Sequence, residues 1–175
     1  MQLRQSPSLK AVPFIGHGFS FKGSFGVINC PQEANFACNE QLSAQDQARA
    51  MQNRIALAKV LQAKKLYLIK QTHSNLVVDI DALNQATSSK DIAPIITQEG
   101  DALITNKARC ALAVLTADCA PLLMVDIKTR WIAAVHAGWR GAVGGIIENT
   151  LEALIARGSR PEDIQVALGP QACFR

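Results

Sequence analysis

The clearest helical pattern in the chain lies in residues 42–64, where apolar positions recur every three or four residues. Ser43 precedes Asp46 by three positions, which is the spacing of a capping box at a helix start. Met51, Ile55, Ala58 and Leu61 or Gln62 share one face, and we expect this face to pack against the core. A second helix is predicted from about residue 144 to 157, with Gly158 as its stop. Its apolar face consists of Ile146, Ile147, Thr150, Leu151, Leu154 and Ile155.

Most other apolar stretches have the length of strands. We expect strands within 65–72, 76–80, 101–105, 110–116 and 160–170, and a hairpin over 121–136 with its turn near 127–130. Residues 1–12 predict an irregular lead-in, 17–30 short strands and turns, and 84–100 a polar surface loop. Because strands outnumber helices and several follow one another directly, the pattern predicts an α+β layered fold.

Composition narrows the class of protein. The chain has 175 residues, 49% of them hydrophobic, so we expect one domain over residues 1–175. The net charge of +4 is spread along the chain without a basic run, which gives little support to nucleic-acid binding and suits a small anionic substrate. No apolar run reaches 18 residues, and the N-terminus lacks a signal-peptide core. Five cysteines without a CxxC pair do not predict a disulfide framework, so a cytoplasmic protein that is not a membrane protein is expected.

The hairpin brings two metal-ligating residue types together. With a turn at 127–130, Asp126 faces Trp131 and Pro121 faces His136. Cys119 lies on the same face as Pro121, so Cys119 and His136 become diagonal neighbours with backbones about 7–8 Å apart, a gap that a metal ion could bridge. A register slip of one residue would place them on opposite faces. A lone histidine or cysteine among apolar residues is also typical of a packed core, so spacing alone leaves both interpretations open.

A third ligand has two candidates, because His17 and His73 are the remaining histidines. His73 is favoured, since it follows an apolar strand and has polar neighbours, as residues at the rim of a sheet often do. One cysteine and two histidines would leave a fourth position open, which is typical of catalytic zinc.

The segment HAGWRGAVGG (136–145) indicates a second function. Its glycines allow a tight turn and a close approach to a ligand, and the helix that follows would offer free N–H groups to an anion. Arg140 could add a bidentate contact to phosphate or carboxylate. The alternative is a plain strand-to-helix turn with a solvated Arg140.

Several of these segments together resemble the YfiH-type laccase-domain family, whose members are described both as multicopper polyphenol oxidases and as purine nucleoside phosphorylases. The resemblance runs from HGFS at His17 to LGP at Pro170 and includes NRIALA, KQTHSNLV, GDALIT, TADCAPLL and HAGWRG. It implies a mixed-sheet layered α/β sandwich with outer helices, and a zinc ion held by His73, Cys119 and His136.

The resemblance also implies an activity. The family is associated with phosphorolysis of purine nucleosides to a base and ribose 1-phosphate, with adenosine deamination as a companion reaction. The expected partners are therefore a nucleoside and phosphate, with no obligate protein partner evident. The residues predicted to be catalytic are Cys119, His136, Asp118 and Arg140. Those predicted to bind substrate are Lys22, Gln71, Asp101, Arg140 and Gly141.

Three departures from the family pattern matter. Lys22 stands where an arginine is usual, and it can replace the charge but not the planar fork. The stretch around Asn39 matches weakly, so we assign no role to Asn39. The chain stops at Arg175, where family members usually continue for several dozen residues, so the domain is expected to be shortened at its C-terminus. Asp118 adjoins Cys119, so it should point to the other face unless the backbone bends there.

A multicopper laccase is excluded, because it needs more imidazoles than three histidines supply. Three other functions stay open. A single copper ion is less favoured than zinc, because Met124 lies an odd number of residues from Cys119 and would face away. A metal-free hydrolase would use Cys119 as nucleophile and His136 as base, for example in amide hydrolysis of a peptidoglycan precursor. A binding protein with an inactive site is the non-enzymatic alternative.

Overall fold

The computed structural model describes residues 3–19, 43–83, 92 and 95–172. These residues form eight strands in two sheets, in the orders β3-β1-β5 and β2-β4-β7-β6-β8. The first sheet contains β1 (Lys65–Lys70), β3 (Ile95–Glu99) and β5 (Cys110–Leu112), and its pairings are parallel. The second contains β2 (Val77–Asp79), β4 (Ala102–Thr105), β6 (Ala120–Asp126), β7 (Ile132–Ala137) and β8 (Ile164–Leu168), with parallel and antiparallel pairs. The α+β class with mixed sheets is confirmed.

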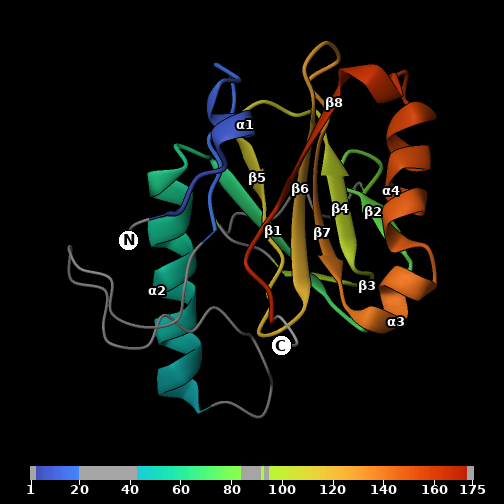
Figure 1. Cartoon of the computed structure of the whole chain (residues 1–175). Coiled ribbons are helices and arrows are strands. Elements are labelled where there is room, and N and C mark those ends of the chain that lie inside the picture. The colour runs from blue at the N-terminus through green and yellow to red at the C-terminus, as the bar shows by residue number, and fades with distance from the viewer. Residues whose placement is uncertain (1–2, 20–42, 84–91, 93–94, 173–175) are drawn as a thin grey trace.

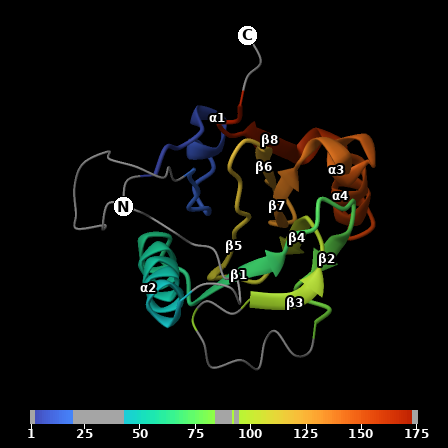
Figure 2. The same ribbon diagram turned by 90° about the horizontal axis from the view of Figure 1, so that it is seen from below.

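The two sheets lie between two long helices, α2 (Ala44–Val60) and α4 (Ile146–Ile155), which stand on opposite sides of the strands (Figures 1 and 2). Side chains of β1 alternate, so Leu66 and Leu68 pack with Ala58 of α2, whereas Tyr67 and Ile69 pack with Leu103 of the other sheet. The order of layers is therefore helix, sheet, sheet, helix. None of the described helices is both long and apolar enough to cross a membrane.

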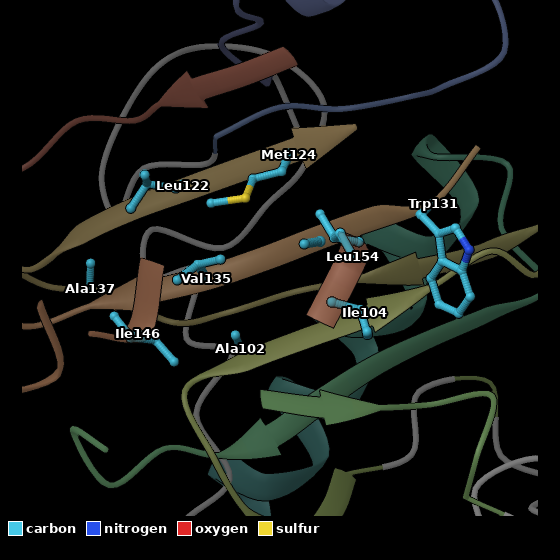
Figure 3. Close-up of a cluster of buried hydrophobic side chains, with 10 residues drawn as sticks. Ala102, Ile104, Leu122, Met124, Trp131, Val135, Ala137, Ile146 and Leu154 are labelled. Carbon is cyan, nitrogen blue, oxygen red and sulfur yellow. The ribbon is translucent and has the colours of Figure 1, made fainter. Parts of the chain in front are cut away.

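The largest buried cluster lies between the five-stranded sheet and α4. Ile146 and Leu154 of α4 contact side chains of β4, β6 and β7, including Ile104, Met124 and Val135 (Figure 3). This cluster packs one face of β6 and β7, whereas the opposite face carries Leu123, Val125 and Ile132 in a second apolar cluster and His136 near the end of β7. Ile155 was expected in this helix face, but it is 44% exposed because it lies at the last position of α4.

Helix α2 begins as predicted, but its buried face differs from the face that the sequence predicted. The Ser43 hydroxyl accepts a hydrogen bond from the Asp46 amide. Met51, Ala58 and Leu61 pack on the sheet as expected, but the fully buried positions are Ala50, Asn53, Arg54 and Ala58, and Ile55 is only half-buried. Ala58 packs directly with Leu66 and Leu68 of the sheet, and Met51, Leu57 and Leu61 are partly buried beside it.

Four other elements differ from expectation. Residues 95–99 form β3 at the edge of the three-stranded sheet, whereas the polar pattern of 84–100 predicted a loop, because an edge strand can be held by backbone pairing to β1 alone. The lead-in contains the short helix α1 (Pro7–Lys10), which has proline in its first turn. The strand predicted over 110–116 ends at Leu112. The predicted helix 144–157 forms as α4, but an unpredicted short helix, α3 (Trp139–Val143), precedes it, and Gly145 between the two has a φ of 88°. Residues 20–30 of the predicted 17–30 strand-and-turn segment lie outside the described residues.

The hairpin register agrees with the sequence prediction. Pro121 pairs with His136, and the Asp126 amide donates to the Trp131 carbonyl. The Asp126 carboxylate accepts hydrogen bonds from the Lys128 and Thr129 amides, so it holds the turn in place. This register is what places His136 and the start of β6 at the same end of the sheet.

Candidate metal centre

Three side chains that are distant in sequence converge at one end of the strands. His73 follows β1, Cys119 immediately precedes β6, and His136 lies near the end of β7. One ligand atom from each residue lies within 4.8 Å of the other two. The Cys119 sulfur is 3.8 Å from His73 Nε2, and the two imidazole rings meet edge-on with centroids 4.8 Å apart. Ligands on a tetrahedral zinc ion are separated by about 3.5 Å, so small movements would complete such a centre.

The three ligand candidates differ in exposure. His136 is buried, Cys119 is half-buried and His73 is exposed. One side of the group therefore opens to solvent, where a substrate or water could approach. A thiolate and two imidazoles fit zinc and copper, which accept sulfur and nitrogen ligands. Met124 is buried against α4, on the face of β6 away from His136, so it does not offer the axial thioether that a blue-copper site often uses.

Asp101, at the start of β4, lies behind the histidines. Its side chain is fully buried, and its Oδ1 is 2.7 Å from His136 Nδ1. Its oxygens also accept hydrogen bonds from the amides of Thr72, His73 and Ser74 and from the Ser74 hydroxyl. Burial alone raises the pKa of Asp101, but hydrogen bonds from His136, Ser74 and Thr72 outweigh it and leave the pKa below its usual value. Direct contact of Asp101 with substrate, which the resemblance implied, is not supported by this burial.

Two glycines allow the elements around the site to approach one another. A Cβ atom at Gly138 would lie 2.5 Å from His73 Cδ2 and 3.3 Å from the Cys119 sulfur. A Cβ atom at Gly141 would lie 2.7 Å from the Ser74 carbonyl oxygen. Separations below 3.0 Å require a neighbour to move, so glycine at 138 is a condition for the observed placement of His73. Gly141, predicted to bind substrate, is buried and contributes packing against Ser74.

The remaining predicted site residues have distinct positions. Gln71 uses its amide to bond the main chain of Leu115 twice, which ties the end of β1 to the segment leading to Cys119. Asp118 is exposed at a backbone bend over 117–119, so the strict strand alternation that would have turned it away does not apply. Arg140 is exposed on α3, with its guanidinium 5.1 Å from the Trp139 ring. Lys22 and Asn39 lie outside the described residues.

The structure brings His73, Cys119 and His136 together and leaves His17 elsewhere, bonded to Ser6. Two other features of this end of the strands were not predicted from the sequence. The buried carboxylate of Asp101 and the close contact at Gly138 were missed as positioning features. The sequence did contain a signal for Asp101, because an acid directly before the apolar strand ALIT is expected to be buried and then needs hydrogen-bond donors nearby.

Comparisons with known proteins show the family to which the chain belongs. Residues 22–175 match the model of the family described as "Multi-copper polyphenol oxidoreductase laccase", and the chain belongs to this family. It is 49% identical to a purine nucleoside phosphorylase of Deinococcus radiodurans over 75 residues, which is 43% of the chain and 30% of the relative. It is 36% identical to adenosine deaminase RL5, from an unknown prokaryotic organism, over 73% of the chain and 49% of that relative.

A solved structure shares the fold as well. The crystal structure of YfiH from Bacillus licheniformis superimposes with a TM-score of 0.65 at 26% sequence identity, covering 88% of the chain and 57% of YfiH. The chain thus spans about half, or less, of the length of the relatives it matches. One relative is named as a purine nucleoside phosphorylase and another as an adenosine deaminase, and the ligand group among the described residues is compatible with a metal-binding member of the family.

Proposed function

We propose that this chain forms a zinc-dependent purine nucleoside phosphorylase site, with adenosine deamination as a companion activity. The observation that carries the proposal is the convergence of His73, Cys119 and His136 within 4.8 Å, with one side of the group open to solvent. The phosphorylase and deaminase names of the relatives supply the class of substrate. A bound zinc ion would supply a Lewis acid and lower the pKa of a coordinated water or hydroxyl.

The chain's own residues would bind and orient the two substrates. In phosphorolysis a phosphate oxygen forms a bond to the ribose C1′ while the C1′–N bond to the base breaks, and the departing base takes up a proton. Arg140 is exposed on the helix that begins beside the ligand group, and its guanidinium matches a phosphate better than an ammonium group does. Lys22 would add positive charge, and Asp118, exposed next to Cys119, would carry the proton to the base.

The decisive experiment incubates the purified, zinc-loaded protein with adenosine or inosine, with and without phosphate. We expect release of free base and ribose 1-phosphate that depends on phosphate, and a slower formation of inosine from adenosine without phosphate. Removal of zinc by a chelator should abolish both reactions, and added zinc should restore them. A zinc-loaded protein that releases no base would contradict phosphorolysis, and activity that survives complete metal removal would favour a cysteine hydrolase.

The role of Arg140 has its own test. Arg140→Ala should raise the KM for phosphate about tenfold or more and leave the KM for the nucleoside nearly unchanged, because a charge-assisted contact is lost. Arg140→Lys should restore part of the effect. Arg109→Ala is the matched control, since Arg109 is an exposed arginine beyond the opposite end of β4. An equal effect of the Arg140 and Arg109 variants would rule out a specific role for Arg140.

A further inference from the structure

The Asp101 carboxylate is shared by the segments that carry both histidines. One oxygen accepts from His136 Nδ1 at 2.7 Å and from the His73 amide at 3.1 Å. The other accepts from the amides of Thr72 and Ser74, at 3.2 and 2.6 Å, and from the Ser74 hydroxyl at 2.8 Å. We propose that Asp101 is a positioning residue that fixes the ring form of His136 and the place of His73 at once. This inference rests on the proposed metal centre.

The first contact determines which nitrogen of His136 is free. Both oxygens of Asp101 accept hydrogen bonds from main-chain amides, so the carboxylate also acts as the acceptor toward the ring. Nδ1 of His136 therefore carries a hydrogen, and in the neutral ring Nε2 keeps its lone pair. That lone pair lies on the ring edge away from Asp101, where a metal ion can use it. Metal-binding histidines commonly have their second nitrogen bonded to a carboxylate in this way.

The second set of contacts determines the position of His73. His73 has a φ of 59°, in the left-handed region that non-glycine residues rarely adopt. Three consecutive amides, from residues 72 to 74, point at one carboxylate and hold the chain in this turn. Because His73 is exposed, side-chain packing covers only part of it, and the backbone turn contributes to its placement.

The main chain of Asp101 also forms hydrogen bonds with both neighbouring segments. Its amide donates to the Leu76 carbonyl, and its carbonyl accepts from the His136 amide at 2.7 Å. The residue therefore joins the 72–76 segment to the end of β7 through the backbone as well as through the side chain. A carboxylate at this junction can hold two ligands in register although they are 63 positions apart in the sequence (136 − 73).

Asparagine at this position separates positioning from packing, because it has nearly the same shape. The asparagine side chain would place its oxygen where Asp101 has Oδ2, because that position accepts three hydrogen bonds. Its NH₂ group would then face His136 Nδ1 and the His73 amide. The ring of His136 would have to present a bare Nδ1 to that NH₂ group and carry its hydrogen on Nε2, where a metal ion needs the lone pair.

The test compares Asp101→Asn with Asp126→Asn as matched control. Asp126 is also fully buried on the five-stranded sheet and also accepts two backbone amides, but it lies at the far end of β6. Nitrogen-15 NMR of the metal-free proteins reports the ring form of His136, assigned through His136→Gln, and amide exchange reports the 72–74 turn. We expect Nδ1–H in the wild type and in Asp126→Asn, Nε2–H in Asp101→Asn, and faster exchange of the His73 amide only in Asp101→Asn.

Zinc affinity provides the second measurement. We expect Asp101→Asn to bind zinc about 10- to 100-fold more weakly than the wild type, and Asp126→Asn to bind it within about twofold of the wild type. The inference is overturned if His136 keeps Nδ1–H in Asp101→Asn, or if the two variants bind zinc equally well. A wild-type protein that binds no zinc would refute the proposed function instead, while the NMR comparison would still decide the role of Asp101.

Discussion

The two ends of the central strands are built in different ways. At the metal end, the strands β4, β6 and β7 present or adjoin Asp101, Cys119 and His136, and the Asp101 carboxylate alone receives five hydrogen bonds. Beyond the other end, the same strands help to line a cavity of about 680 Å³. Much of its wall is apolar, and contributors include Leu61, Leu112, Leu123 and Ile132.

Polar contacts are also satisfied differently at the two ends. His17 lines the cavity, is 6% exposed, and has no hydrogen-bond partner for Nδ1 among the described residues. At the metal end, by contrast, both oxygens of the buried Asp101 are engaged. Hydrogen bonds have preferred directions and distances, whereas apolar contacts depend mainly on area. The two histidine segments are therefore placed by directed hydrogen bonds to Asp101, whereas the cavity wall is held mainly by apolar packing.

The largest expected effect comes from the two described thiols, one at each end. Cys119→Ser should weaken zinc binding at least 100-fold, because a hydroxyl is a poor substitute for a thiolate. Cys110 lines the cavity, and burial together with the charge of Asp81 raises the pKa of its thiol. Cys110→Ser should therefore bind one zinc ion like the wild type. Competition with a zinc-binding dye measures both, and equal losses would contradict the assignment of Cys119.

A smaller but still large effect is expected from Gly138→Ala. The added methyl group would collide with the His73 ring, so zinc affinity should fall about 10- to 100-fold and the free energy of unfolding by about 1–3 kcal/mol. Gly16→Ala is the control at the cavity end, because its Cβ would meet nothing closer than 3.6 Å. Zinc titration and thermal unfolding of both variants check the prediction. A Gly138→Ala protein that binds zinc normally would show that His73 is not held as tightly as the structure indicates.

Asp126, at the end of β6 far from the candidate ligands, allows a test of how stability depends on pH. Burial raises the pKa of Asp126, but the nearby donors of Ser159, Thr129 and Lys128 outweigh it and lower the pKa. A lowered folded-state pKa means that the stabilisation is complete above the unfolded value of about 3.9 and is lost as the pH falls through the folded value. Asp126→Asn should thus lose about 1.5–3 kcal/mol of unfolding free energy at pH 7.

Denaturant unfolding from pH 7 to pH 2 measures this stabilisation. The difference between wild type and Asp126→Asn should shrink at acid pH, and His136 should keep its ring form in both proteins at pH 7. A difference that stays constant down to pH 2 would mean that the charge on Asp126 contributes nothing.

The smallest expected effect is a gain in stability from filling the cavity. Ala134 is buried on β7 and lines the cavity, so Ala134→Val would place two more methyl-sized groups in it. The free energy of unfolding should rise by about 0.5–1.5 kcal/mol, and zinc affinity should not change. Thermal unfolding and zinc titration check this. A loss of stability would show that the cavity wall near Ala134 is already tightly packed.

Local sequence determined the elements whose signals are contained within a few residues. The capping pair Ser43 and Asp46, the hairpin turn at 127–130 and the pairing of Pro121 with His136 followed from residue type and side-chain alternation. The same alternation selected Cys119 and His136 as neighbours, and it set Met124 on the other face. Two histidines remained as the third ligand, and the position of His73 after an apolar strand favoured it over His17.

The tertiary structure decided what depends on contacts between distant segments. The polar stretch before Gly100 became β3 because β1 offered it a partner, and α2 packs Ala58 rather than Ile55 fully against the sheet. Asp101 serves both histidine segments only because β4, β7 and the end of β1 meet there. Chain order and residue type therefore determined which residues supply the candidate metal ligands. Their distances, the free nitrogen of His136 and the turn at His73 depend on hydrogen bonds that form only after the sheets have packed.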